Sequence, residues 1–350
     1  MIFTGNNMSN KNLIRKVINF LKFPEMYMYF RKRIVNKHII IFTYHRVYPG
    51  KDNLFVKNVC LEEFEKQVKY LKENFKIYSL EKLINLLSKP KIDNPIKENI
   101  AVITFDDGYK DNYIYAYPIL KKYQVPATIF LISGYIGKDE LFWWDKVGYI
   151  ISNSQKSSIN IPNFGDFSLI DSQKKLHCIS FLLRRFKNIS NQLKNEYIIN
   201  LQKICDVTIP SGLAEKIILS WDEIREMSDN GISFGAHTLN HPNLANIDLN
   251  EVEKEIVDSK KMIEERLKTD ITLFAYPYGT KSDYNNEIIE LIKNAGFKCA
   301  CSSNHQLVNK YNMEDMYHLS RIQVSNHFDK FKIEISGIWS DLNYIFRNSK

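Results

Sequence analysis

The chain lacks an uninterrupted apolar run long enough to cross a membrane, which needs roughly 18 or more such residues. Its apolar N-terminal stretch, 13–42, is interrupted by the basic residues Arg15, Lys16, Lys22, Arg31, Lys32, Arg33 and Lys37. The apolar core and small residues of a secretory signal peptide are also missing. We therefore expect no transmembrane helix, no export signal and a cytoplasmic location.

The N-terminal segment 1–38 is predicted to lie outside the main domain. Within it, residues 13–34 form a basic amphipathic helical pattern. Such a helix can pack onto the protein or lie on a membrane surface. Packing onto the protein is the commoner arrangement, so peripheral contact with a membrane is kept as the alternative.

Paired cysteines and basic blocks are also missing. The five cysteines are odd in number and show no framework of pairs, which favours a reducing compartment over a secreted, disulfide-linked state. Cys299 and Cys301 are predicted as small core residues on one face of a strand. The net charge is +8, but Lys and Arg are spread among Asp and Glu, and nucleic-acid-binding motifs are absent. We therefore expect no nucleic-acid partner.

The chain does contain a regular alternation of strand and helix patterns. Buried-strand patterns occur at 39–44, 100–105, 127–131, 232–236 and 272–276. Helical patterns lie at 61–75, 221–230, 252–267 and 284–295, the second of them opened by a capping box at Ser220 to Glu223. This alternation implies parallel βαβ units, hence an α/β sheet or barrel.

One stretch, about 139–219, breaks this alternation. It shows no convincing pair of strands and has a helical pattern near 173–206. We expect an insertion between two strands of the sheet, placed where it could cap an active site. Trp143 and Trp144, near its start, are interpreted as packing or lid residues, with stacking on a sugar ring as the alternative.

Two short motifs carry the chemistry. Thr104–Gly108 reads Thr-Phe-Asp-Asp-Gly, and His237–His241 reads His-Thr-Leu-Asn-His. Asp107 and the two histidines form a common ligand set for a catalytic divalent metal with an open position for water. Asp106 remains beside that metal, free to act as a base. The set predicts metal-assisted hydrolysis.

Each motif also has an ordinary structural interpretation. Asp107-Gly108 is a frequent turn pair, and histidines four apart share one face of a helical turn, where they are more often structural. Two adjacent carboxylates after a buried strand are costly, however, unless a cation or hydrogen bonds compensate. The joint occurrence of both motifs favours the metal site.

Chemistry-bearing residues follow the carboxyl ends of four predicted strands. His45 follows the first strand, Asp106 the second, His237 the fourth and Tyr278 the fifth. In parallel α/β barrels this edge is where active sites are built. We therefore expect these residues to converge.

With these motifs, the chain resembles the polysaccharide deacetylases of the NodB-homology class, known as carbohydrate esterase family four. The resemblance covers about 39–335, leaves 336–350 as a C-terminal tail, and includes the strand Pro126–Phe130. It implies a distorted (β/α) barrel of about seven parallel strands with the helical insertion at 139–219. It also implies that Asp106 is the catalytic base and that the backbone N–H of Tyr278 is an oxyanion donor.

The chain departs from the family pattern in two places. Ala275 stands where the third motif usually has an arginine that orients the base, and Arg321 is our candidate substitute. The usual C-terminal Leu-x-His motif is not evident, since His318 precedes Leu319. A branch of the family that acts on poly-N-acetylglucosamine takes its acid histidine from an early strand, and Tyr44-His45-Arg46-Val47 is similar to that element. We therefore prefer His45 to His318 as the general acid.

The resemblance predicts a metal-dependent hydrolase that removes N-acetyl groups from a cell-surface polysaccharide or its amino-sugar precursor and releases acetate. Zinc is the preferred metal, with cobalt, manganese or nickel as alternatives. One rival hypothesis is a catalytically impaired glycan-binding protein, suggested by the missing arginine. Others are a metal-dependent amidase or esterase on another acylated substrate and, weakest, a basic nucleic-acid binder. The oligomeric state is left open.

Overall fold

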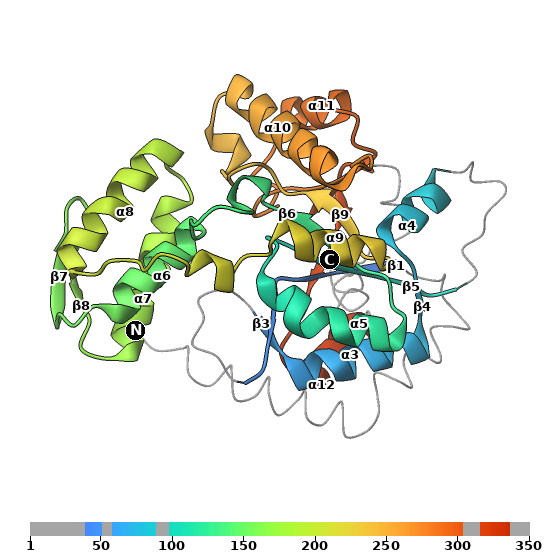
Figure 1. Cartoon of the computed structure of the whole chain (residues 1–350), viewed down its shortest axis with the longest axis horizontal. Helices are drawn as coiled ribbons and strands as arrows, with labels where there is room; N and C mark the ends of the chain where they lie inside the picture. The colour runs from blue at the N-terminus through green and yellow to red at the C-terminus, as the bar shows by residue number, and fades with distance from the viewer. Residues whose placement is uncertain (1–38, 51–57, 89–97, 304–315, 337–350) are drawn as a thin grey trace, which may run out of the picture.

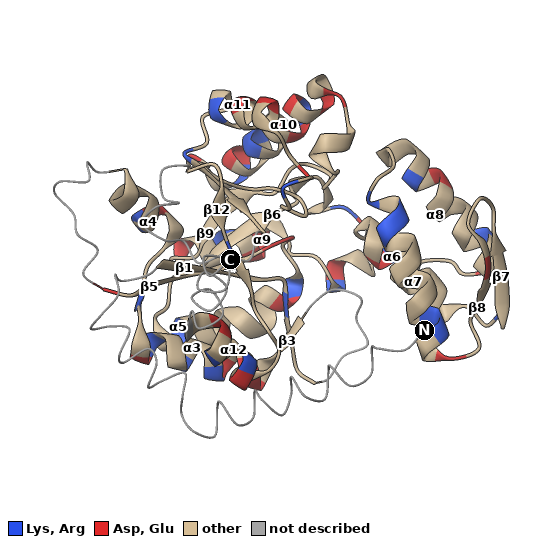
Figure 2. Cartoon of the chain, turned by 180° about the vertical axis from the view of Figure 1, so that it is seen from behind, with Lys and Arg blue, Asp and Glu red and all other residues tan. Residues whose placement is uncertain are grey.

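A computed structural model describes residues 39–50, 58–88, 98–303 and 316–336. The predicted N-terminal segment 1–38 and nearly all of the tail at 336–350 lie outside these residues. Within them, no helix is long and apolar enough to span a membrane. Figure 2 shows Lys and Arg lying among Asp and Glu on the outer helices, as the sequence suggested.

The core of the fold is a parallel sheet that curves into a barrel (Figure 1). Its strands are β1 (Ile39–Tyr44), β4 (Lys76–Ile77), β5 (Ile100–Phe105), β6 (Thr128–Leu131), β9 (Ser233–Ala236), β10 (Leu273–Ala275), β11 (Cys299–Ser302), β12 (Leu319–Ser320) and β13 (Ile322–Gln323). The order is β12-β11-β10-β9-β6-β5-β1-β13, and β4 pairs with β5 beside this path. Every pair in the sheet is parallel.

Arg321 marks the closure of the barrel. It separates β12 from β13, and these two strands form the two ends of the sheet order. One short segment therefore pairs with β11 on one side and with β1 on the other. Counting β12 and β13 once and setting β4 aside reduces the nine strands to seven, which confirms the predicted barrel.

Successive strand residues alternate between two buried clusters. On β1, Ile39 and Ile41 belong to the smaller cluster, and Ile40 and Phe42 to the larger. The larger cluster includes the surrounding helices, whereas the smaller includes only α4 (Leu80–Leu87), so the smaller fills the barrel interior. Of the predicted strands, β1, β5, β6 and β10 are buried on both faces, as expected.

Helices cover the outside of the barrel (Figure 1). They are α3 (Leu61–Asn74), α5 (Tyr117–Tyr123), α9 (Trp221–Asp229), α10 (Leu249–Leu267), α11 (Asn286–Asn294) and α12 (Phe328–Ser336). The predicted capping box is present at α9, where Ser220 and Glu223 satisfy each other's backbone N–H groups. Two short strands, β2 (Arg46–Tyr48) and β3 (Asn58–Cys60), pair beside the barrel.

The insertion lies to one side of the barrel in Figures 1 and 2. It contains α6 (Trp143–Asn153), β7 (Ser158–Ile161), β8 (Gly165–Ser168), α7 (Ser172–Phe186) and α8 (Asn191–Cys205). The prediction that this stretch has no strand pair was wrong, because β7 and β8 form an antiparallel hairpin. Asn163 and Gly165 adopt positive φ in its turn, and such short strands leave too few alternating positions to stand out in a sequence.

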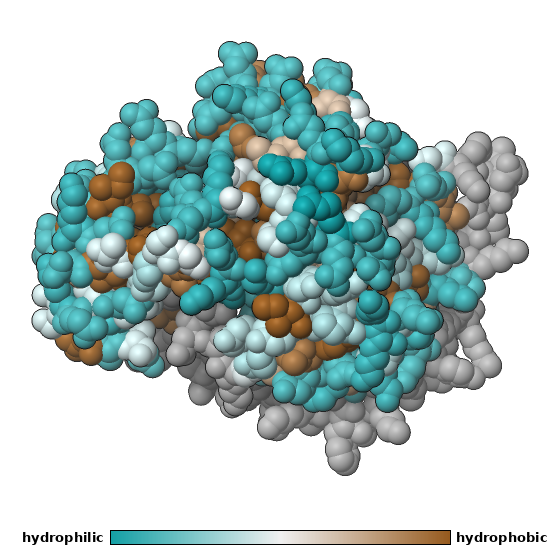
Figure 3. Space-filling model, in the orientation of Figure 1, coloured by the Kyte–Doolittle hydropathy of each residue, from teal (hydrophilic) through white to brown (hydrophobic). Residues whose placement is uncertain are grey.

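The insertion also carries exposed apolar side chains. Ile170, Leu176, Leu193 and Ile199 are exposed there. In Figure 3, brown patches interrupt the hydrophilic surface over this part of the molecule. Scattered apolar residues of this kind are common on protein surfaces.

Candidate metal centre and active site

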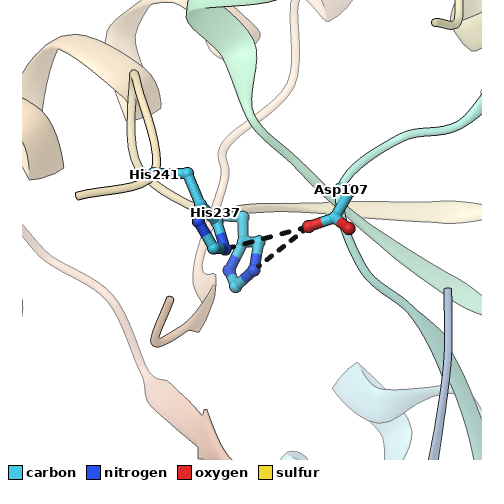
Figure 4. Close-up of side chains that lie close together, drawn as sticks. All are labelled: Asp107, His237 and His241. Carbon is cyan, nitrogen blue, oxygen red and sulfur yellow. Dashed lines mark ion pairs between the residues drawn. The ribbon is translucent and has the colours of Figure 1, made fainter. Parts of the chain in front are cut away.

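Asp107, His237 and His241 meet at the carboxyl edge of the barrel, as the motifs predicted. Asp107 follows β5, and the histidines lie in the histidine loop (residues 237–241) that follows β9. All three are buried, and one ligand atom from each lies within 4.8 Å of the others. Figure 4 shows the three side chains pointing toward one another. The fold thus brings together groups about 130 residues apart.

The distances between these groups fit a shared cation better than direct hydrogen bonds. Asp107 Oδ1 lies 3.7 Å from His237 Nε2 and 3.9 Å from His241 Nε2. Hydrogen bonds are shorter, whereas ligand atoms around a tetrahedral zinc ion lie about 3.4 Å apart. Burial and neighbouring Asp106 raise the pKa of Asp107 well above its usual value. A divalent cation would offset that cost, so the residues fit a metal.

Both imidazoles are held in the neutral form that binds metals. Burial lowers the pKa of His237 and, together with His237, lowers that of His241 well below its usual value. His237 Nδ1 donates to the Ala275 carbonyl at 2.7 Å, which leaves the Nε2 lone pair facing Asp107. A hydrogen bond to the second ring nitrogen is how proteins orient histidine ligands.

The histidine loop is not a helical turn, so the local structure expected from the His237/His241 spacing was wrong. Residues 237–241 form a bend, and Thr238 and His241 have φ of 64° and 58°. Thr238 Oγ1 accepts from the His241 backbone N–H at 3.0 Å, and this hydrogen bond holds the bend. Strained left-handed conformations of this kind concentrate at functional sites.

Glu255 of α10 supports the histidine loop, and sequence reasoning missed it. Its Oε2 accepts the backbone N–H groups of Leu239 and Asn240 at 2.9 and 2.7 Å, and its Oε1 accepts Asn240 Nδ2 at 2.8 Å. Three donors from the segment between the two histidines therefore converge on one buried carboxylate. No short sequence motif signals this role of Glu255, because the residues that it bonds lie 15 and 16 positions away in the chain.

We expect Glu255→Ala to weaken metal binding about 10- to 100-fold, the usual effect of removing a residue that orients metal ligands. The histidine loop would lose the hydrogen-bond acceptor that fixes its conformation, and with it the relative position of His237 and His241. Chelator competition with zinc measures the affinity, and thermal unfolding of the metal-free protein separates a local from a global effect. Glu253→Ala, an exposed acid on the same helix, is the matched control. Equal zinc affinity in both variants would contradict the role of Glu255.

Arg321 binds the other carboxylate, Asp106. Arg321 Nη1 and Nη2 donate to Asp106 Oδ1 and Oδ2, each at 2.7 Å, and both residues are buried. Nη1 also donates to Thr104 Oγ1 at 3.2 Å, and Nε donates to the Ser302 carbonyl at 3.2 Å. The predicted substitute for the missing arginine is therefore placed on the side chain that the family arginine orients.

This pairing keeps Asp106 ionised. Burial alone would raise the pKa of Asp106, but Arg321 and then His237 bring it below its usual value. The same edge therefore carries two carboxylates in different surroundings. Asp106 is paired with the Arg321 guanidinium, whereas Asp107 has no arginine or lysine partner among the residues that the structure describes. Two neighbouring carboxylates in different environments are suited to different roles.

Of the two candidate acid histidines, His45 shares this edge. It lies between β1 and β2, is half-buried, and its charge contributes to lowering the pKa of Asp106 and of His241. Its carbonyl accepts Asn112 Nδ2 at 2.9 Å. His318 precedes β12, at the amino end of that strand, and its Nδ1 is hydrogen-bonded to the Tyr284 hydroxyl at 3.0 Å.

Tyr278 follows β10 and packs against His241. Its ring centroid is 4.8 Å from that of His241, and its φ is 60°. Gly279, next in the chain, has φ of 68°, and a Cβ there would lie 2.7 Å from the Ser303 backbone nitrogen. This turn therefore requires a glycine at position 279, directly after the tyrosine whose ring packs against His241.

The insertion also contacts the site. Trp144 packs edge-on against His241, with ring centroids 4.8 Å apart, and donates from Nε1 to the Tyr109 hydroxyl at 2.6 Å. Trp143 and Trp144 are both buried, which supports packing rather than open sugar platforms. Lys187 Nζ pairs with Asp283 at 2.6 Å and lies 4.5 Å from the Tyr278 ring centroid.

Comparison with known proteins agrees with this fold. Residues 93–300 match the Polysaccharide deacetylase family. The chain is 24% identical over 286 residues to the putative polysaccharide deacetylase YxkH of Bacillus subtilis, covering 81% of this chain and 71% of that one. It is 25% identical over 274 residues to the poly-β-1,6-N-acetyl-D-glucosamine N-deacetylase of Staphylococcus aureus, covering 77% and 70%.

The structure is also similar to the deacetylase PplD of Streptococcus pyogenes, solved with acetate. The TM-score is 0.54 at 21% identity, covering 84% of this chain and 95% of that one. This likeness supports the barrel fold. From the family match, the chain belongs to the polysaccharide deacetylase family and is a hydrolase of that class, as the sequence predicted.

Proposed function

We propose that this protein removes N-acetyl groups from amino sugars of a cell-surface glycan, using a divalent cation, preferably zinc, held by Asp107, His237 and His241. One observation carries the proposal. The three buried ligands lie beside Asp106, a carboxylate whose charge is maintained by Arg321. A ligand set and a separate base are the two parts that metal-assisted hydrolysis needs.

The base in this mechanism is Asp106. When bound, the cation supplies Lewis acidity to the acetamide carbonyl and to water. Asp106 accepts the proton of the attacking water, and Arg321 holds both carboxylate oxygens so that the base keeps its orientation and its charge. Arg321 thereby fills the role whose apparent absence suggested an impaired, glycan-binding protein.

The remaining steps are assigned to His45 and Tyr278. The Tyr278 backbone N–H stabilises the oxyanion that forms when the carbonyl is attacked. His45, at the same edge of the barrel, protonates the departing amine, which leaves poorly without a proton. The products are acetate and a free amino sugar.

The substrate is proposed from the relatives. The S. aureus relative is named for poly-β-1,6-N-acetyl-D-glucosamine. Oligosaccharides of N-acetylglucosamine are therefore the first substrates to test, with an amino-sugar precursor as a second group. Acetyl esters and other acylated amides test the rival activity.

The proposal predicts that metal content and acetate release disappear together. The double variant His237→Ala/His241→Ala should retain less than about a tenth of the zinc of the wild type and release no acetate, since a single carboxylate binds zinc weakly. Elemental analysis and an acetate assay measure the two quantities. His177→Ala, an exposed histidine on α7, is the control. A wild type that binds oligosaccharide and zinc without releasing acetate would support the impaired-enzyme rival instead.

A further inference from the structure

A polar cavity of about 240 Å³ lies where the insertion meets the barrel. From the barrel side it is lined by Tyr135, after β6, and by Asn240 of the histidine loop. From the insertion it is lined by Trp143 on α6 and by Asn191 and Lys194 on α8. Two of these residues directly precede residues of the candidate metal centre or its wall: Asn240 precedes His241, and Trp143 precedes Trp144, whose ring contacts His241. The cavity therefore lies next to the histidine loop.

Lys194 is the unusual member of this wall. The residue is 2% exposed, and its Nζ donates to Asn191 Oδ1 at 3.2 Å and lies 4.7 Å from the Trp143 ring centroid. Within residues 39–50, 58–88, 98–303 and 316–336, it forms no ion pair with a carboxylate. An ammonium group has three donors, and a buried charge without a counter-ion is costly. Lys194 therefore lacks the anion that usually accompanies a buried lysine.

The charged groups around Lys194 do not supply that anion. Glu140 also lines the cavity, but its carboxylate is paired with Lys146 Nζ at 2.5 Å. Glu255 acts on Lys194 from a distance, yet its two oxygens already accept three N–H groups of the histidine loop. Burial accordingly lowers the pKa of Lys194 to about 8, with Glu255 opposing the shift. An anion in the cavity would stabilise the charged form.

The size and lining of the cavity indicate what would enter it. The volume is below the range of about 300–1,000 Å³ typical of whole-ligand pockets, so it suits one sugar unit or its substituent. Amide side chains such as Asn195 and Asn240 can bond hydroxyl groups, and the single ammonium matches a single negative charge.

We propose that this cavity is a substrate subsite that binds a singly charged anionic substituent on a sugar close to the one that is deacetylated, with Lys194 as its cation. The inference rests on the proposed function, since it gives the substrate class for the same site. A carboxylate and a phosphodiester both carry such a charge. Lys194 determines which substrate is preferred, whereas the chemical step takes place at Asp106 and the proposed metal ligands.

The test compares three oligosaccharides of equal length that contain N-acetylglucosamine. One is neutral, one carries a carboxylate on the neighbouring sugar, and one carries a phosphodiester there. We expect the wild type to favour at least one anionic substrate about 10- to 100-fold in kcat/KM, mainly through KM, because a charge-assisted hydrogen bond is gained. The two anionic substrates distinguish the source of the charge.

Lys194→Met should abolish this preference by lowering kcat/KM on the anionic substrates to about the value on the neutral one. Methionine keeps much of the buried volume, and thermal unfolding checks the fold. Lys203→Met, an exposed lysine on the same helix, is the control and should keep the preference. A preference that survives in Lys194→Met, or a wild type that prefers the neutral substrate, would overturn the subsite.

The outcome for the subsite is separable from that for the proposed function. If the wild type releases no acetate from any substrate, the proposed activity fails. Calorimetric binding of the same three oligosaccharides to the zinc-loaded wild type and Lys194→Met still decides the subsite. Tighter binding of the anionic compound that is lost in Lys194→Met supports it, and equal affinities reject it.

Discussion

Asp106→Asn is expected to bind zinc as the wild type does and to lose activity by about 100- to 10,000-fold, the usual contribution of a general base. Asparagine has nearly the same shape as aspartate but cannot accept a proton from water. It leaves Asp107, His237 and His241 in place. Zinc content and kcat for acetate release, measured on the same preparation, test this expectation.

Two further variants serve as controls for Asp106→Asn. Asp222→Asn, on an exposed side chain of α9, should change neither quantity. Asp107→Asn should lower zinc content and activity together, because it removes a ligand. Full activity in Asp106→Asn would refute its role as the base, and loss of zinc in that variant would show that the two aspartates share one role.

Arg321→Met is expected to destabilise the fold by about 3–5 kcal/mol and to reduce acetate release strongly. Removing one member of a buried ion pair leaves the other charge without compensation, and that cost is of this size. Asp106 would also lose both hydrogen bonds that orient it. Denaturant unfolding of the metal-free protein measures the free energy of unfolding, and the acetate assay measures the loss of activity.

The double variant Asp106→Asn/Arg321→Met separates the pair from its members. With both charges removed, most of the stability lost in Arg321→Met should return, although activity should not. Arg225→Met, a partly exposed arginine on α9, is the control for loss of an ordinary ion pair. If the two single effects on stability simply add in the double variant, Asp106 and Arg321 are not coupled.

The strands and the metal motif could be predicted because their signals are local. β-branched and aromatic runs marked β1, β5, β6, β9 and β10 within about a residue of their observed bounds. The ligands follow two of these strands directly, so a parallel sheet was enough to bring them to one edge. Neither inference needed to know which residues face each other across the barrel.

The hairpin of the insertion and the conformation of the histidine loop could not be read in the same way. A spacing of four residues between His237 and His241 is compatible with a helical turn and with the observed bend. The hydrogen bonds from Leu239 and Asn240 to Glu255 decide between them, because they favour the bend. Glu255 lies on α10, and the sequence pattern of that helix indicates which of its faces is buried but not which groups its polar side chains bond.

By itself, the sequence determined the parallel βαβ units, the place of the insertion, and the identity of Asp107, His237 and His241 as one chemical group, while the choice of a barrel over an open sheet came from the resemblance to the deacetylase family. Those features depend on periodicity, strand ends and short motifs, which are properties of neighbouring residues. Only the tertiary structure decided that Arg321 pairs with Asp106 across 215 positions. It also decided that Lys194 is buried with no carboxylate partner among the residues that the structure describes. Ion pairing and burial depend on three-dimensional proximity and on the exclusion of water, and linear spacing carries no record of either.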